Sequence, residues 1–438
     1  MKNTHPLKHL VEVQKMGIAK GVYSACSANE YVIEAVLQRA LASDMYVYIE
    51  ATANQVNQFG GYTNMTPYEY RDFVYSIAAK QKFPIERIIL GGDHLGPLTW
   101  KNEKSDIAME KSIQLIKQYV DAGFSKIHID ASMHLADDDA GTRLDTRTIA
   151  ERSAVLCQAA QDAYAELRLR APNTLEPVYV VGSEVPIPGG SQEAESLQVT
   201  KSEDFIETVE TFKKIFYQKG LDRAWENVVA VVVQPGVEFG NDEIHEYNRN
   251  EAKTLCKALK RYPNLVFEGH STDYQTPEAL KQMVQDGIAI LKVGPALTFA
   301  LREGLFMLNY IENELYKYNT DIQLSHFIDA LDDSMIKRTN DWEKYYHESG
   351  EKIHLSRKYS LSDRARYYLP SREVREAIDI MIKNLKNIDI PLTLISEYMP
   401  MQYNKIRRGL LKNSPEELIK DKIMNCIDNY IYAISSNN

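Results

Sequence analysis

The sequence contains few cysteines and no long apolar run. Its four cysteines, Cys26, Cys157, Cys256 and Cys426, are far apart and form no CxxC pair, which argues against a thiolate zinc site and against a disulfide framework. No apolar run approaches the length of a transmembrane helix, and the polar segment from Met1 to Leu10 lacks the apolar core of a signal peptide. We therefore expect a cytoplasmic protein with reduced thiols and no membrane partner.

Several motifs of common enzyme classes are also missing. No GxGxxG follows a predicted strand, no HExxH is present, and there is no P-loop or protein-kinase signature. Basic residues are fewer than acidic ones, 51 against 61, so the net charge is −10 and nucleic acid is not an expected partner. This balance still permits a local basic pocket for a phosphorylated substrate.

What the chain does contain is a regular alternation of short apolar runs and helical patterns. Its 438 residues are 44% hydrophobic and 26% charged, an ordinary globular balance. Eight runs with strand character, each followed by a helical pattern, span residues 20–27, 46–50, 87–97, 126–130, 177–184, 228–233, 265–271 and 288–295. Eight such units predict a (β/α)8 TIM barrel. A doubly wound open sheet is the alternative, and it is less favoured because polar groups end nearly every strand rather than one switch point.

The chain after the eighth unit has a different character. Long helical patterns rich in Lys, Glu and Tyr, including Tyr367-Tyr368, run to the end of the sequence. We therefore expect a barrel over residues 1–313 and a C-terminal helical extension over residues 314–438 that packs on it. The tyrosines could form a partner surface, but packing against the barrel is the favoured interpretation.

The third run carries a dense group of polar residues. It begins as an apolar strand, which we expect to break at Gly91-Gly92 and to present Asp93 and His94 side by side. Barrel enzymes hold their active sites at the carboxyl ends of their strands. This stretch therefore marks the expected active-site face.

Charged and imidazole side chains also share one face of other predicted strands, because side chains alternate along a strand. Inside a barrel such groups must pair with one another, bind a metal ion or meet water. The residues expected at the mouth are Glu50, Asp93, His94, His128, Asp130, Glu184, Gln234, Glu268, His270 and Lys292. Imidazoles and carboxylates together suit a divalent ion such as zinc, manganese or magnesium.

These residues also have structural interpretations. Asp93 could cap a loop, and His128 with Asp130 could form a stacked structural pair. Lys292 could bind phosphate, act as an amine nucleophile or form a salt bridge at the edge of the core. By analogy with other barrels, Ser271 and Gly294 lie where backbone N–H groups and a helix N-terminus often form a phosphate cradle.

Several long motifs resemble one family, the non-catalytic subunit of class II tagatose-1,6-bisphosphate aldolase. The resemblance covers the barrel almost throughout, and the tyrosine-rich extension fits it. The motifs that carry it are Glu50–Thr52, Asn54–Val56, Gln58–Thr63, Met65–Pro67, Gly91–Pro97, Lys126–Met133, Gly182–Pro186 and Val293–Thr298.

The resemblance implies a barrel that takes part in cytosolic hexitol or amino-sugar catabolism, such as that of galactitol. Members of the family are described as supporting a separate catalytic aldolase subunit, so it also implies an oligomer with such a partner. Some similar chains are instead described as 4-epimerases of fructose 6-phosphate or tagatose 6-phosphate. The family therefore leaves two functions open.

The chemistry of a 4-epimerase can be narrowed from the substrate. C4 of a 2-ketohexose phosphate is not adjacent to the carbonyl, so simple deprotonation cannot invert it. Because no nicotinamide fingerprint is present, the remaining route is retro-aldol cleavage between C3 and C4, rotation of the aldehyde and re-addition. A metal ion would polarise the C2 carbonyl, and a carboxylate would take the proton of the C4 hydroxyl.

We therefore predict metal-dependent aldol chemistry on a ketohexose phosphate, with 4-epimerisation as the main expectation and the auxiliary aldolase subunit as the alternative. A Schiff-base route through Lys292 is less favoured. The expected metal ligands are Glu184, His270, His94 and Asp130, and the expected proton-transfer residues are Glu268 and Asp93. The expected substrate-binding residues are Glu50, Asn54, Gln55, His128, Gln234, Ser271, Lys292 and Gly294.

Overall fold

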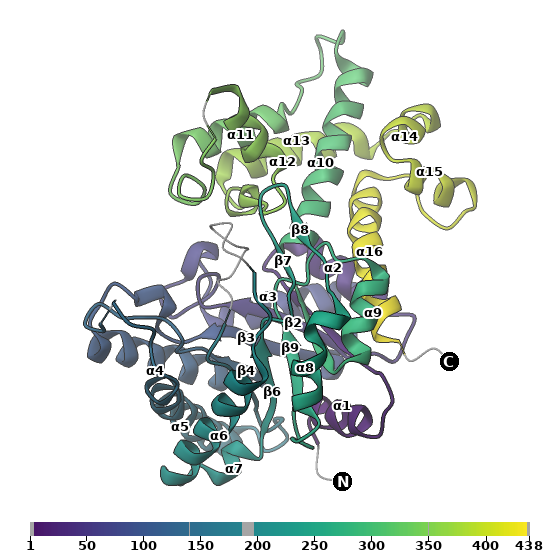
Figure 1. The fold of residues 1–438 in the computed structure, drawn as a ribbon. Coiled ribbons are helices and arrows are strands. Elements are labelled where there is room, and N and C mark those ends of the chain that lie inside the picture. The colour runs from purple at the N-terminus through teal and green to yellow at the C-terminus, as the bar shows by residue number, and fades with distance from the viewer. Residues whose placement is uncertain (1–3, 140, 186–196, 349, 436–438) are drawn as a thin grey trace.

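The fold is a closed parallel barrel with helices around it. The computed structural model describes residues 4–139, 141–185, 197–348 and 350–435. Within these residues, eight parallel strands follow one another around the barrel in chain order (Figure 1). They are β1 (Val22–Cys26), β2 (Val47–Thr52), β3 (Ile88–Leu95), β4 (Lys126–Ile129), β5 (Val178–Val181), β6 (Val228–Val233), β9 (Val266–Gly269) and β10 (Ile288–Val293). The predicted TIM barrel is confirmed.

Helices follow the strands and cover the outside of the barrel. Apolar side chains on the outer strand faces, such as Ile127, Ile129 and Phe267, are buried against them, as the alternation predicted. The main covering helices are α2 (Glu30–Ala40), α3 (Pro67–Gln81), α4 (Ser105–Asp121), α5 (Thr146–Arg170), α6 (Ser202–Gln218), α8 (Arg249–Leu259), α9 (Pro277–Gln285) and α10 (Pro295–Tyr316). A short helix, α7 (Asp222–Trp225), precedes β6.

Local sequence explains where several helices begin. The Thr66 hydroxyl accepts from the Glu69 N–H while the Glu69 carboxylate accepts from the Thr66 N–H, which forms a capping box at the start of α3. Asn29 caps α2 through the Tyr31 N–H. Ser202 is the first residue of α6, and its hydroxyl donates to Glu203.

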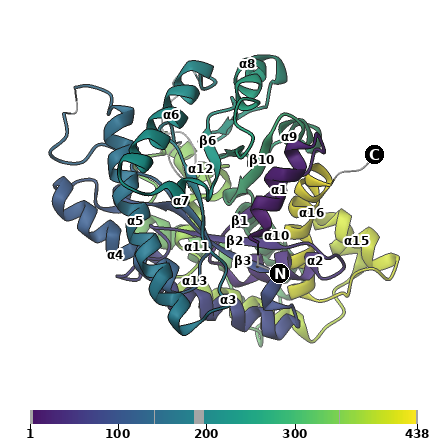
Figure 2. The same ribbon diagram turned by 90° about the horizontal axis from the view of Figure 1, so that it is seen from below.

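The lower half of the barrel interior is apolar. Helix α1 (Pro6–Lys15) inserts Leu7, Leu10 and Val11 against it at the end where the strands begin (Figure 2). This helix was not predicted, because the segment lies outside the strand–helix alternation. The interior side chains of this apolar layer include Tyr48, Ile89, Val178, Val180, Ala230, Val232, Val266 and Ile290.

Strand β3 differs from the prediction. It does not break at Gly91-Gly92 but continues to Leu95, pairing with β2 as far as the partners Thr52 and Asp93. Its pairing with β4 shifts register between Gly92 and Leu95, and His94 has a left-handed φ of 48°. This irregularity interrupts the side-chain alternation, which lets the neighbouring residues Asp93 and His94 both face the mouth.

The extension begins within a helix shared with the barrel. The expected boundary at residue 313 falls inside α10, which rises from the barrel toward α11 to α15, while α16 returns beside α9 (Figure 1). Helix α16 packs against α2, α9 and α10. The helices of the extension are α11 (Phe327–Lys337), α12 (Ile353–Tyr359), α13 (Arg372–Lys386), α14 (Leu392–Tyr398), α15 (Pro400–Arg407) and α16 (Pro415–Ile434).

The extension also meets a small hairpin on the barrel. Strands β7 (Glu238–Phe239) and β8 (Ile244–His245) form an antiparallel pair between β6 and α8. The carbonyl oxygen of Asn241 in its loop accepts from the Leu361 N–H at 2.8 Å. None of the helices in the described part of the chain combines the length and apolar character needed to cross a membrane.

Candidate active site

Two buried lysines hold the acids of the barrel interior together. Lys126 Nζ lies 2.8 Å from Glu50 Oε1 and 2.6 Å from Glu268 Oε2. Lys292 pairs with Glu50 and lies 3.0 Å from Asp93 Oδ1. Burial alone would lower the pKa of each lysine, but the surrounding carboxylates raise both pKa values above the ordinary value. Both lysines are therefore cations, and Lys292 is not a free amine nucleophile.

A glycine makes room for this network. A Cβ at Gly91 would lie 2.6 Å from the Glu50 Cγ atom, so any side chain there would displace the carboxylate. Gly91 is the strand partner of Glu50 across the β2–β3 pairing. Gly91 therefore provides space inside the barrel, while Gly92 allows close packing against Leu95 and Tyr119 of α4, and neither glycine ends the strand.

Three imidazoles meet above the lysine network. The ring centroids of His94, His128 and His270 are 4.9 to 5.1 Å apart. With a carboxylate oxygen of Asp93, their nitrogens form a buried group in which all the candidate ligand atoms lie within 4.8 Å of one another. These side chains come from β3, from β4 and from the residue that follows β9.

Each imidazole is held by a carboxylate. His94 Nδ1 lies 2.8 Å from Asp130 Oδ2, and His270 Nε2 lies 3.0 Å from Glu268 Oε1. His128 Nδ1 lies 2.9 Å from Asp93 Oδ1. These contacts leave the second ring nitrogen of each histidine available, and the buried Nε2 of His128 has no hydrogen-bond partner among the described residues.

Burial and the surrounding carboxylates set the protonation states of the site. Burial lowers the pKa of His270 to about 4, so its ring is neutral at pH 7. Burial would raise the pKa of Asp130, but its hydrogen bond with His94 outweighs this effect and lowers the pKa to about 2. Burial would likewise lower the pKa of His94, but the carboxylates of Asp93 and Asp130 raise it.

This arrangement fits a divalent metal ion. Three imidazoles with one open side are a known zinc-binding set, and carboxylates behind the rings orient metal-binding histidines. The orphaned Nε2 of His128 also indicates that the cluster accommodates a ligand. The nitrogen-rich donor set suits zinc better than manganese or magnesium, which prefer oxygen ligands.

The observed cluster differs from the predicted ligand set. Asp130 lies behind His94, and its second oxygen accepts from the Ser132 N–H and hydroxyl. Glu184 is not brought to the cluster, because it lies beyond the end of β5 and pairs with Arg143 at 2.6 Å. Asp93 and His128, which were assigned to other roles, join His94 and His270 instead.

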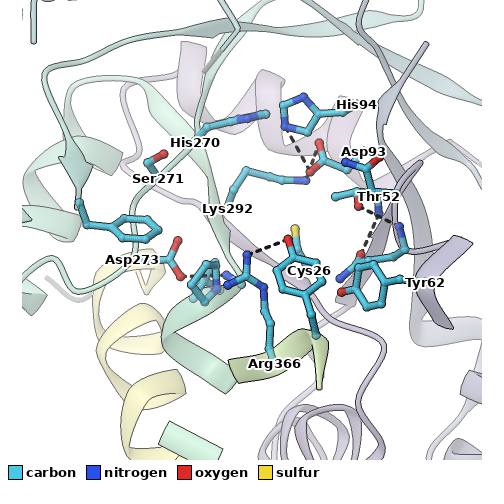
Figure 3. A pocket seen from close by; sticks show the side chains of 17 residues that line it. Cys26, Thr52, Tyr62, Asp93, His94, His270, Ser271, Asp273, Lys292 and Arg366 are labelled. Atoms are coloured by element: carbon cyan, nitrogen blue, oxygen red, sulfur yellow. Dashed lines mark hydrogen bonds and ion pairs between the residues drawn. The ribbon is translucent and has the colours of Figure 1, made fainter. Parts of the chain in front are cut away.

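A pocket that is open on one side lies over this cluster (Figure 3). Strand ends and the loop after β2 provide much of its wall, and the extension provides Arg366 and Tyr367. The residues that line it are Cys26, Thr52, Asn54, Gln55, Tyr62, Asp93, His94, Phe239, His270, Ser271, Asp273, Lys292, Val293, Gly294, Pro295, Arg366 and Tyr367.

Of the residues predicted to bind substrate, some line the pocket and others lie beneath it. Asn54, Gln55, Ser271, Lys292 and Gly294 line the pocket. Two further predicted residues, Glu50 and His128, are fully buried beneath it.

Gln234 does not line the pocket. Its Oε1 accepts from the Gly236 and Val237 N–H groups at 2.9 and 3.0 Å, so it stabilises the turn after β6. The alternation rule could not foresee this, because Gln234 follows the last residue of the strand.

The expected phosphate cradle already has an occupant. Asp273 Oδ1 accepts from the Gly294 N–H at 2.9 Å and from the Ala296 N–H at 2.8 Å. The carboxylate therefore caps the N-terminus of α10 from the loop that follows the neighbouring strand β9. Burial raises the pKa of Asp273 to about 6, although these backbone hydrogen bonds oppose the shift.

Sequence reasoning missed the residues that come from outside the strands. Arg366 and Tyr367 lie in a 3-10 turn, η5 (Arg364–Tyr367), and Tyr62 lies in another, η1 (Gly61–Thr63). Neither turn has a periodic pattern that would place it at the mouth. The sequence of the tyrosine pair at residues 367–368 does not indicate that the Tyr367 side chain lines the pocket while Tyr368 is buried.

Comparison with known proteins gives a consistent result along the chain. A family model described as D-tagatose-1,6-bisphosphate aldolase subunit GatZ/KbaZ-like matches residues 7–435. The D-tagatose-1,6-bisphosphate aldolase subunit GatZ of Salmonella dublin is 47% identical over 428 residues, which is 98% of this chain and 99% of that protein. The protein of the same name from Klebsiella pneumoniae is 47% identical over 431 residues, with the same coverage.

A solved structure is similar over nearly the same length. It is described as a probable tagatose 6 phosphate kinase from Sinorhizobium meliloti 1021, and it is 41% identical with a TM-score of 0.86. The match covers 95% of this chain and 100% of the other.

Proposed function

The chain belongs to the GatZ/KbaZ-like family of D-tagatose-1,6-bisphosphate aldolase subunits, and we propose that it supports a separate catalytic class II aldolase chain in tagatose phosphate metabolism. The observation that carries this proposal is the match of nearly the whole chain to proteins named as subunits of that aldolase. We further propose a hetero-oligomer in the cytoplasm, a setting that suits the four unpaired cysteines.

A specific observation favours a second candidate function, chemistry at this chain's own site. Three histidines held by carboxylates beneath an open pocket are costly to bury unless they bind something. The candidate reaction is the C3–C4 aldol chemistry of a ketohexose phosphate, which would give a tagatose 6-phosphate/fructose 6-phosphate 4-epimerase. This reaction would break and re-form the C3–C4 bond, which is also the bond that a tagatose-1,6-bisphosphate aldolase would cleave.

The side chains suit this reaction in a particular way. His94, His128 and His270 would hold the divalent ion, which would supply Lewis-acid polarisation of the substrate carbonyl. Asp93 faces the pocket and is kept ionised by Lys292, so it would accept the proton of the C4 hydroxyl as the C3–C4 bond breaks. Glu268 is fully buried and paired with Lys126, so it would orient His270 rather than transfer a proton.

No kinase activity is proposed. The Sinorhizobium meliloti structure is described as a probable kinase, but this sequence has no P-loop and no protein-kinase signature.

The two candidate functions differ in whether the chain is active without a partner. The purified chain would be stripped with a chelator and incubated with tagatose 6-phosphate or fructose 6-phosphate plus each divalent ion, with products resolved by chromatography. It would also be mixed with a catalytic class II aldolase chain, and the cleavage rate and half-life of the pair would be measured on tagatose 1,6-bisphosphate. We expect the chain to co-purify with that partner and to raise its rate and half-life.

Two variants connect each outcome to the site. If the chain acts by itself, His270→Ala should lower the interconversion rate by about 100-fold, and Glu268→Gln should lower it less. If the chain only supports its partner, both variants should still activate the aldolase. If the chain alone interconverts the two sugar phosphates and neither variant changes the rate, the residues at the barrel mouth are not the active site. If the chain neither binds nor activates an aldolase chain, the supporting role is excluded.

A further inference from the structure

The pocket contains one cationic group that the proposed chemistry does not use. Arg366 enters from the extension, on the opposite side of the pocket from Asp93 and His94 (Figure 3). Its guanidinium group donates to the carbonyl oxygen of Asp363 at 2.9 Å and to the Tyr367 hydroxyl at 3.1 Å. The side chain is half-buried, and its accessible part faces the pocket.

The other positive groups at the mouth are already neutralised. Lys292 is paired with both Glu50 and Asp93. The N–H groups at the start of α10 are occupied by Asp273. Neither can receive an anionic ligand without first losing a buried carboxylate partner.

Arg366 has no such partner. Among the described residues, no carboxylate forms an ion pair with its guanidinium group, and the acid nearest in sequence, Asp363, is paired with Arg302. Burial would lower the pKa of Arg366, but the neighbouring Tyr367 and Tyr62 hydroxyls, and after them the Asp363 carboxylate, raise it. Arg366 is therefore a cation that forms no direct ion pair with a carboxylate among the described residues.

The turn that carries Arg366 is fixed to the barrel at several points. Asp363 accepts from the Thr298 hydroxyl at 2.6 Å, in the first turn of α10, and lies 3.2 Å from Arg302 Nε. The Tyr274 hydroxyl donates to the Leu361 carbonyl at 2.6 Å. An arginine held in this way loses little further conformational entropy when it binds a ligand.

Two tyrosines complete this wall. The rings of Tyr62 and Tyr367 are 4.8 Å apart, and both side chains line the pocket. Their hydroxyls can donate hydrogen bonds to an oxyanion, while the planar guanidinium group can bind two of its oxygens at once. Arginine combined with hydroxyl donors is a set that recognises phosphate.

We propose that Arg366, with Tyr62 and Tyr367, forms a phosphate-binding subsite that holds the phosphate monoester of the sugar, so that the extension supplies the specificity for phosphorylated over free ketohexose. The identity of the sugar in this inference rests on the proposed function, whereas the binding of a phosphate group at Arg366 does not depend on it. The phosphate end would lie at Arg366 and the reacting carbons at Asp93 and His94, across the same pocket.

Calorimetric titration of the full chain tests the subsite with three probes: tagatose 6-phosphate, free tagatose and inorganic phosphate. The variants are Arg366→Met, Arg366→Lys and Tyr367→Phe, with Arg372→Met as the control because Arg372 is an exposed arginine of α13. Thermal denaturation of each variant checks that it is folded.

Arg366→Met should lower the affinity for tagatose 6-phosphate and for inorganic phosphate by about 10-fold or more, the usual loss for a charged hydrogen-bonding group. The affinity for free tagatose should change by less than about twofold, because tagatose lacks the phosphate group that Arg366 would bind. Arg366→Lys should recover part of the affinity, because it restores the charge without the planar fork. Tyr367→Phe should cause a smaller loss, about 3-fold, and Arg372→Met should cause none.

The inorganic phosphate titration separates failure of this inference from failure of the proposed function. Phosphate binding that depends on Arg366, without any binding of tagatose 6-phosphate, would keep the subsite and overturn the proposed sugar. If Arg366→Met lowers the affinities for tagatose and tagatose 6-phosphate equally, Arg366 has a structural role and does not bind the phosphate group. Phosphate binding unchanged by Arg366→Met, or absent from the wild-type chain, would overturn the subsite.

Discussion

The two ends of the pocket are built in different ways. The end at Asp93 and the three histidines is made from residues on or next to barrel strands, and buried ion pairs through Lys126 and Lys292 hold it. The end at Arg366 is made from short turns and is held by hydrogen bonds to Asp363 and to backbone carbonyls. The first end can therefore change little without cost to the fold, whereas the second can vary while the barrel stays intact.

The largest expected effect tests the rigidity of the strand-built end. Lys126→Met should lower the free energy of unfolding by about 3–5 kcal/mol, because it leaves Glu50 and Glu268 buried without their shared cation. Urea denaturation would measure it. Lys80→Met, which removes a surface lysine paired with Glu30, should cost less than about 1 kcal/mol. Equal costs for the two variants would mean that the buried network does not hold this end together.

A smaller effect should separate the two ends. Asp363→Asn weakens the attachment of the Arg366 turn to Arg302 and Thr298, which we expect to cost about 2 kcal/mol of stability. Phosphate affinity should fall several-fold while zinc affinity stays within about twofold, both measured by calorimetry. Asp329→Asn, at an exposed site on α11, is the matched control. A comparable loss of zinc affinity in Asp363→Asn would show that the ends are not independent.

The smallest effect concerns Asp273, whose carboxylate lines the same pocket. Its pKa is about 6 in the folded chain against 3.8 for an ordinary aspartate, so the folded state binds more protons between about pH 4 and pH 6. Stability should therefore fall as the pH rises through this window. Asp273→Asn can still accept from the N–H groups of Gly294 and Ala296, so it should flatten this dependence and leave stability at pH 8 equal or higher, by about 3 kcal/mol at most.

Denaturation curves at several pH values would check this prediction. Strong destabilisation by Asp273→Asn at pH 8 would instead mean that the start of α10 needs the negative charge.

The same contrast explains what the sequence could predict. Strand alternation placed His128, Glu268, His270 and Lys292 inside the barrel, and chain order gave the barrel itself. Alternation ceases to apply where a strand ends, and Glu184 and Gln234, which follow the ends of β5 and β6, form other contacts and do not line the pocket.

Other features of the site depend on contacts between distant segments. No local pattern shows that Asp130 turns toward His94 instead of toward a ligand, or that Asp273 reaches the N–H groups of Gly294 and Ala296. The position of Arg366 depends on the path of the whole extension. Such contacts are decided by packing, which sequence periodicity does not encode.

The position of α16 has a consequence for the order in which the protein is made. This helix packs against α2 and α9 of the outer ring as well as α10, and the Tyr430 hydroxyl donates to the Thr272 carbonyl at 2.9 Å. During translation, all eight strands leave the ribosome long before the residues that cover this side of the barrel. A nascent chain would expose apolar surface of these helices until the segment around residue 434 emerges, and ribosome-associated chaperones would have that interval in which to bind it.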